Sequence, residues 1–271
     1  MSRTALAALT LGAAMAVPSF AFADTKITAA GSTALQPLVQ AAAEAYQAQH
    51  SDVKISVTGG GSRTGLALVA SKSVDLGDSD IEAANQPDLV DHKVAVVGFS
   101  IVVNPQSGVK NLKKSQIQDI FSGKVTNWKD VGGKDQSITV INRPASSGTR
   151  AVFLKTLMGR TPLSKDTLTE DATGTVVQKV KQTAGAVSYA SYSGTHNQTG
   201  IDELSIDGVT PNDENVQNGK YPFWSYEHVY TNGRPSKDVA RFIEFLQSNG
   251  ALMRKIGYIA IGDMKVKEND R

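Results

Sequence analysis

Residues 26–81 read KITAAGSTALQPLVQAAAEAYQAQHSDVKISVTGGGSRTGLALVASKSVDLGDSDI, and this stretch decides the fold class. Three short runs suited to strands, at 26–31, 52–60 and 73–81, alternate with two runs suited to helices, at 37–50 and 62–73. Strands and helices that alternate at this length imply right-handed crossovers and a mostly parallel sheet. We therefore predict an α/β protein with helices flanking the sheet.

A second α/β set follows a longer apolar run at 93–104, which is predicted to be a strand that leaves the first sheet. The later elements are predicted helices at 115–123, 147–159, 173–183 and 236–250, predicted strands at 137–144, 184–191 and 221–231, and a polar, turn-rich segment at 201–219. We expect two lobes joined by two extended crossings. Lobe I is predicted to contain 24–102 plus 224–271, and lobe II 103–223.

The first 23 residues have the pattern of a secretory signal peptide. An apolar run follows Arg3 and ends in AFAD, where the small residues Ala21 and Ala23 predict cleavage after Ala23. The chain contains no cysteine, so we expect no disulfide, no thiolate metal site and no lipid anchor. The pattern predicts a protein that is free in the periplasm or secreted.

The charge balance argues against a nucleic-acid partner. The whole chain has 28 basic and 26 acidic residues, and removal of the segment that contains Arg3 leaves 27 against 26. No basic run interleaved with aromatic residues is present. A nearly neutral protein that binds an anion must therefore concentrate its positive potential in one site.

Three loops share one design, in which a strand ends, small hydroxyl and glycine residues follow, and a helix begins. They are AAGSTALQP around Ser32 and Thr33, TGGGSRTG around Ser62, and NRPASSGTR around Ser147, Gly148 and Thr149. The first turn of a helix offers unpaired N–H groups and partial positive charge, and the hydroxyls add donors. One such loop is usually only a helix cap or a turn, but three at strand ends in two lobes predict a tetrahedral-oxyanion site.

Two charged residues refine this prediction. Arg143 lies four residues before Ser147, so its planar guanidinium is expected to reach the same anion. Asp80 ends another strand and can accept a hydrogen bond from a P–OH group of phosphate, whereas sulfate at neutral pH has no proton with which to donate one. We therefore expect phosphate rather than sulfate. Asp78, two positions earlier, is expected to point to the opposite face of the strand and to be structural.

Four motifs in this order, GSTALQP (31–37), TGGGSRTG (58–65), LGDSD (76–80) and RPASSGTR (143–150), resemble the periplasmic phosphate-binding proteins of ABC-type phosphate importers. The resemblance covers essentially all of 24–271 and implies a two-lobed clamshell that binds one dehydrated phosphate between its lobes. It also implies a monomer that delivers phosphate to the permease and ATPase subunits of an importer. The implied phosphate ligands are Ser32, Thr33, Ala34, Ser62, Asp80, Arg143, Ser147, Gly148 and Thr149.

The sequence leaves one detail of the first loop open. Some members of that family have an aromatic residue after the threonine, where this chain has Ala34. Whether Ser32 or Thr33 supplies the main hydroxyl is therefore undecided at this point.

Other functions fit the sequence less well. An enzyme is not expected, because GGSRT lacks the second glycine of a nucleophile elbow and the four histidines are scattered. The glycines of GGGSRTG are not followed by the lysine of a P-loop, and no metal or cofactor is expected. Two alternatives stay open: the same fold binding sulfate, molybdate or a phosphonate, and a surface protein for adhesion or phosphate sensing.

Overall fold

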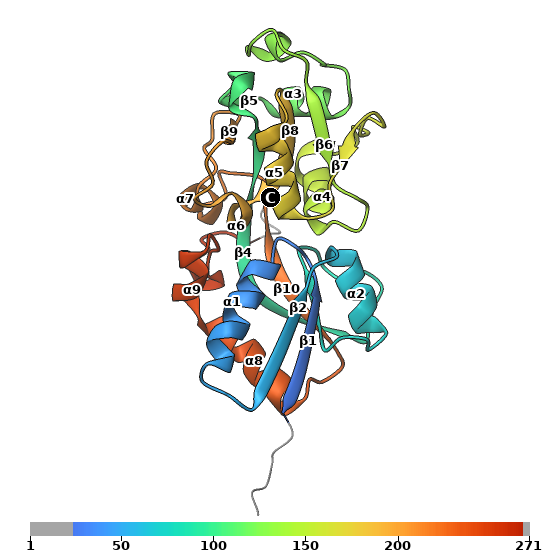
Figure 1. Cartoon of the computed structure of the whole chain (residues 1–271), viewed down its shortest axis with the longest axis vertical. Coiled ribbons are helices and arrows are strands. Elements are labelled where there is room, and N and C mark those ends of the chain that lie inside the picture. The colour runs from blue at the N-terminus through green and yellow to red at the C-terminus, as the bar shows by residue number, and fades with distance from the viewer. Residues whose placement is uncertain (1–23, 268–271) are drawn as a thin grey trace, which may run out of the picture.

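The computed structural model describes residues 24–267 and has two lobes connected by two long strands (Figure 1). The predicted signal peptide, residues 1–23, lies outside the described residues. Within 24–267, no helix combines the length and the apolar character needed to cross a bilayer.

Lobe I, the lower half of Figure 1, contains the sequence that opens the described chain and two helices from its C-terminal part. Its elements are β1 (Thr25–Gly31), α1 (Gln36–Gln47), β2 (Val53–Thr58), α2 (Ser62–Ala70), β3 (Leu76–Ser79), α8 (Lys237–Ser248) and α9 (Gly250–Lys255). Apolar faces hold these helices in place: α1 packs on α8, with the ring centroids of Tyr46 and Phe242 5.5 Å apart. The α/β alternation predicted from residues 26–81 is thus present.

Lobe II, the upper half of Figure 1, is built from the middle of the chain. Its elements are β5 (Asn111–Leu112), α3 (Lys114–Phe121), β6 (Thr139–Asn142), α4 (Gly148–Phe153), β7 (Leu168–Thr169), α5 (Thr173–Gln182), β8 (Ala186–Ser191), α6 (Tyr192–Thr195), β9 (Asp202–Ile206) and α7 (Asp213–Gln217). The predicted helix at 147–159 is α4 followed by a π-helical turn at Leu154–Met158. The segment 201–219, predicted only as polar and turn-rich, contains β9 and α7.

The two crossing strands are β4 (Leu89–Val103) and β10 (Trp224–Asn232), which pair antiparallel to each other. The strand order is β2-β1-β3-β10-β4-β8-β6-β7, with β9 on β4 and β5 on β9. The pairs of β1 with β2 and β3, and of β6 with β7 and β8, are parallel, and antiparallel pairing is confined to the partners of β4 and β10. Because β4 changes partners between Gly98 and Phe99, one strand serves both lobes.

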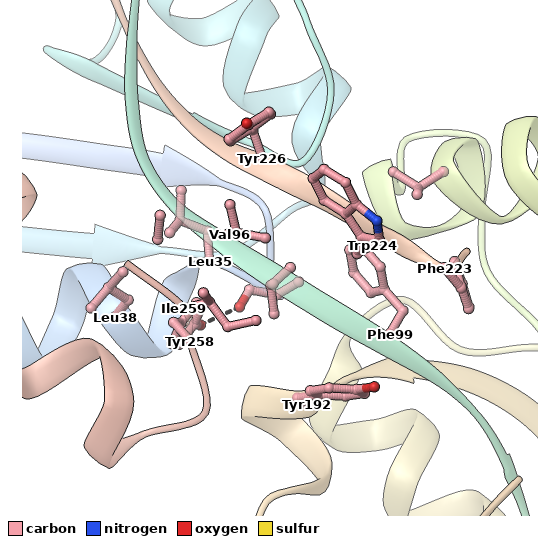
Figure 2. Close-up of a cluster of buried hydrophobic side chains, with 14 of the residues drawn as sticks. Leu35, Leu38, Val96, Phe99, Tyr192, Phe223, Trp224, Tyr226, Tyr258 and Ile259 are labelled. Carbon is pink, nitrogen blue, oxygen red and sulfur yellow. Dashed lines mark hydrogen bonds between the residues drawn. The ribbon is translucent and has the colours of Figure 1, made fainter. Parts of the chain in front are cut away.

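A continuous aromatic core follows the crossing (Figure 2). Phe99 on β4 lies 5.1 Å from Phe223, measured between ring centroids, and Trp224 and Tyr226 on β10 are buried beside it. Such rings bury large apolar areas and stabilise the junction between the lobes. The lobe boundaries near 102 and 223 stay a prediction.

Candidate functional site

The first two predicted loops meet because their strands are neighbours in a parallel sheet. The carboxyl ends of parallel strands lie at one edge, so the loops after β1 and β2 leave the sheet side by side. The Ser32 amide donates to the Asp78 carbonyl at 2.8 Å, and the Gly61 amide donates to the Gly31 carbonyl at 2.8 Å. The first loop is thereby joined to β3 and the second loop to the first.

Gly31 is required where β1 ends against β3. Its φ is +144°, and a β-carbon built there would lie 2.1 Å from the Asp78 carbonyl oxygen. No other residue combines this backbone conformation with so close an approach. The glycine of GSTALQP therefore sets the distance between the first loop and β3.

Asp80, directly after β3, is buried and accepts hydrogen bonds from both lobes. Its Oδ1 accepts from the Ser32 hydroxyl, and its Oδ2 accepts from the Thr149 hydroxyl at 2.9 Å. Its own amide donates to Ser62 Oγ at 2.9 Å. Burial raises the pKa of Asp80, and the hydrogen bonds from Ser32 and Thr149 oppose that rise by favouring the carboxylate.

Arg143, directly after β6, reaches back to lobe I. Its Nη2 donates to Thr33 Oγ1 at 3.0 Å and to the Asp171 carbonyl at 2.9 Å. The residue is 2% exposed, and its Nε and Nη1 have no acceptor among residues 24–267. Burial lowers the pKa of the guanidinium, and Tyr189, Asp80 and Asp171 oppose that shift. Arg143 thus presents unused donors inside a buried environment that also contains Asp80.

The remaining predicted residues lie around this pair. Ser147 is the N-cap of α4 and accepts from the Arg150 amide at 3.2 Å, and the Ala34 amide donates to Ser32 Oγ at 3.0 Å. Gly148 packs so closely that a β-carbon there would lie 2.0 Å from Ser62 Oγ and 2.9 Å from Asp80 Cβ. All nine predicted residues therefore come together at the junction of the lobes, and their role as ligands stays a prediction.

The structure gives the hydroxyl groups of Ser32 and Thr33 different partners. The Ser32 hydroxyl is bonded to Asp80, whereas Thr33 Oγ1 accepts from Arg143 and from the Thr173 amide, the latter at 3.2 Å. Both hydroxyls therefore organise the two charged residues.

Sequence reasoning missed several residues that hold this site. The Ala34 carbonyl accepts from the Ser193 hydroxyl at 3.0 Å and from the Tyr258 hydroxyl, which comes from the C-terminal part of the chain (Figure 2). Thr173, at the start of α5, lies 3.3 Å from Thr33 between hydroxyl oxygens. Only the hydroxyl at a fourth helix start, in TGT, could have indicated Thr173 from sequence.

The expected orientation of Asp78 was wrong. Side chains two positions apart on a strand share a face, because the side-chain period is two residues. Asp78 is fully buried, and the nearby Asp80 adds to burial in raising its pKa well above the usual range. Glu227 on β10, also fully buried, interacts with both aspartates. The sequence signal that could have pointed to Glu227 was an acidic residue inside the largely apolar strand WSYEHVYT (224–231).

This group of acids is not arranged as a metal site. Among residues 24–267, no group of three or more His, Cys, Asp or Glu side chains is placed to hold a metal ion. A cavity of about 150 Å³ borders Asp80, but its other lining residues are Ile81, Glu82, Ala151, Val152, Lys155, Thr156 and His228, so none of the other predicted ligands lines it. The arrangement as a whole suits a small anion held between an arginine and a carboxylate.

Comparison with known proteins gives a consistent result. The PBP superfamily domain matches residues 16–249. The phosphate-binding protein PstS of Bacillus subtilis is 44% identical over 253 residues, which cover 90% of this chain and 83% of that protein. A putative phosphate ABC transporter substrate-binding protein from Clostridium perfringens, solved with bound phosphate, superposes with a TM-score of 0.83 at 27% identity, over 88% of this chain and all of that one.

A second solved structure agrees. An ABC-type phosphate transport receptor from Vibrio cholerae has a TM-score of 0.70 at 29% identity, over 86% of this chain and 99% of that one. The family match over residues 16–249 includes every loop of the site. The chain therefore belongs to the PBP superfamily and, within it, to the PstS family of phosphate-binding proteins.

Proposed function

We propose that the chain captures inorganic phosphate between its lobes. The observation that carries this proposal is Arg143, a buried guanidinium whose Nε and Nη1 have no acceptor among the described residues. A buried cation with unused donors is costly unless an anion accepts from it. The planar guanidinium suits the oxygens of a phosphate group.

Asp80 supplies the preference for phosphate. A dianionic or trianionic oxyanion without a proton would place lone pairs against its carboxylate, whereas a P–OH group donates to it. The first N–H groups of α4, from Gly148 and Thr149, have no intrahelical acceptor and complete the set of donors. The PstS names of the relatives support the same ligand.

Calorimetric titration of dialysed protein tests this proposal. Phosphate is expected to bind with saturable heat at one site, and sulfate and molybdate, which have no proton for Asp80, are expected to bind at least about tenfold more weakly, the effect of one unmet hydrogen bond to a charged group. Methylphosphonate is expected to lose a similar amount because its methyl group replaces an oxygen that accepts a hydrogen bond. Preference for another of these anions would reassign the ligand. No binding of any anion would contradict the proposal and favour the adhesion or sensing role.

The transport role is part of the same proposal. We propose that the chain is exported as a monomer after cleavage behind Ala23 and catalyses no reaction of its own. It would then deliver phosphate to the permease and ATPase of an importer. Two checks are available: mass spectrometry of the secreted chain should begin at Asp24, and loaded protein should stimulate the ATPase of the reconstituted importer. A chain that keeps residues 1–23, or that leaves the ATPase at its basal rate, would contradict these parts.

A further inference from the structure

Glu227 lies directly behind the proposed phosphate site. On β10, His228 pairs with Ser79 of β3, so the antiparallel register places Glu227 opposite Asp80. On its other side Glu227 pairs with Ala95 of β4, which is uncharged. Glu227 is 0% exposed. Its carboxyl group thus faces the carboxyl groups of β3 across a strand pair that passes through the junction of the lobes.

Among residues 24–267, no cation forms an ion pair with this carboxyl group. The charged and titratable groups near it are Asp80, Asp78 and Tyr258, with Arg143 beyond Asp80. Neither oxygen of Glu227, and neither oxygen of Asp78, has a donor among residues 24–267. The adjacent His228 is bonded through Nδ1 to Asp91 at 2.8 Å and does not supply one. A buried carboxyl group without a cation keeps its proton.

The proton turns an unfavourable contact into a hydrogen bond. Burial and the nearby Asp80 raise the pKa of Glu227 well above the usual range, which favours the protonated acid and would let Glu227 donate to Asp80. Burial also raises the pKa of Asp80, but Ser32, Thr149 and Arg143 oppose that rise by favouring the carboxylate. Two neighbouring acids in environments that separate their pKa values take up complementary roles.

The acceptor count at Asp80 gives this arrangement a function. An ionised carboxylate accepts about four hydrogen bonds. Ser32 and Thr149 supply two, and a protonated Glu227 supplies a third. About one acceptor position is then left for a proton of the ligand.

We propose that Glu227 is a neutral carboxylic acid that donates to Asp80, holds it as an ionised acceptor for the phosphate proton, and so acts as a positioning residue for anion selectivity. The inference rests on the proposed capture of phosphate. Glu227 itself does not contact the ligand in this arrangement.

Two substitutions of Glu227 separate this role from simple packing. Glu227→Gln keeps the shape and an N–H donor toward Asp80, so its phosphate affinity should stay within about threefold of wild type, since the hydrogen bond is retained. Glu227→Leu removes the donor, and phosphate affinity should fall about 10- to 100-fold, with a smaller preference over sulfate. Glu203→Gln and Glu203→Leu are matched controls, since Glu203 accepts from Ser100 in lobe II, and neither should change the preference.

The pH dependence supplies a second measurement. Deprotonation of Glu227 places a negative charge beside Asp80 and the anion, so wild-type affinity should fall as pH rises through the raised pKa of Glu227. The Glu227→Gln variant has no carboxyl group at this position to ionise, so its affinity should not show this fall. The ionisation of phosphate itself affects both proteins equally and cancels in the ratio of the wild-type affinity to the variant affinity. Parallel pH profiles for the two proteins would overturn the proposal.

Infrared difference spectroscopy tests the proton without any ligand. Wild type minus Glu227→Gln should show the C=O stretch of a protonated carboxylic acid at neutral pH, and wild type minus Glu203→Gln should not. Absence of that band overturns the inference even if Glu227→Leu does not fold. Failure of phosphate to bind wild type, with the band present, would instead reject the proposed function and leave the protonated pair standing.

Discussion

At the scale of single residues, Arg143 and Asp80 combine burial with opposite hydrogen-bonding capacities. Arg143 has donors on Nε and Nη1 that no described residue uses, and Asp80 is an acceptor that already links the two lobes through Ser32 and Thr149. Each residue therefore uses some of its hydrogen-bonding capacity to hold the protein together. The remaining capacity, the Nε and Nη1 donors of Arg143 and the remaining lone pairs of Asp80, is available to an anion. Substitution of either should change binding more than folding.

Replacement of Arg143 by alanine is expected to weaken phosphate binding strongly. The change removes the donors to the anion and leaves Asp80 without its nearest cation. The expected loss is about 2–4 kcal/mol in binding free energy, by analogy with broken buried charge pairs. Calorimetry measures it, and Arg241→Ala on the exposed face of α8 is the matched control. Wild-type affinity of the Arg143 variant would place this residue outside the site.

Replacement of Asp80 by asparagine is expected to change the selectivity. The amide oxygen can still accept from Ser32 and Thr149, while the NH₂ group offers donors to an anion that has no proton. Phosphate binding should weaken modestly, and sulfate binding should improve by at least about 1.4 kcal/mol, or tenfold. Competition between the two anions measures this. Asp78→Asn, on the same face of β3, is the control and should still reject sulfate. If Asp80→Asn also rejects sulfate, the shape of the cavity sets the selectivity.

At the scale of elements, the two lobes approach closely at the start of α4. Gly148 faces Ser62 at the start of α2 and Asp80 at the end of β3. The backbone of Ser146 accepts from the Arg63 amide at 3.1 Å in the same region. Two helix starts and one strand end thus meet with no room for an added methyl group.

A methyl group at Gly148 is therefore expected to keep the lobes from closing. Gly148→Ala would place Cβ 2.0 Å from Ser62 Oγ, so α4 must move away from α2. We expect phosphate affinity to fall at least about tenfold, since strain from overpacking is about 1–3 kcal/mol. Gly174→Ala at the start of α5 has nothing within 4 Å of its Cβ and is the matched control. Equal phosphate affinity of the two variants in calorimetry would show that α4 does not need this close approach.

At the scale of the whole molecule, we expect the crossing of β4 and β10 to let the lobes move as units. The strands carry the aromatic core through the junction, whereas the direct links between the lobes are hydrogen bonds such as those of Thr149 to Asp80 and Arg143 to Thr33. An anion that contacts both sides stabilises the arrangement in which these links form.

Phosphate is accordingly expected to make the protein more compact. Small-angle scattering should give a smaller radius of gyration with saturating phosphate than without it, because only the closed arrangement presents Arg143 and Asp80 to one ligand. Arg143→Ala at the same phosphate concentration should show little change. An unchanged radius in wild type, with binding confirmed by calorimetry, would indicate lobes that are closed before phosphate arrives.

The sequence by itself determined the α/β alternation, the course of the two crossings and the residues of the three loops. These features are local: a strand, a following hydroxyl or glycine, and a helix start lie within a few residues of each other. Parallel strands then bring such loops to one edge within each lobe, and Asp80 after β3 and Arg143 after β6 lie at those edges.

Only the tertiary structure decided which groups stand behind Asp80. Glu227 meets Asp80 through the antiparallel pairing of β10 with β3, elements from opposite ends of the chain, and no local pattern encodes that register. The same holds for Tyr258, which bonds to Ala34. Cross-strand neighbours depend on sheet order and register, which the packing of the complete chain sets. The protonation of Glu227 follows from that packing, because burial without a cation is a property of the assembled fold.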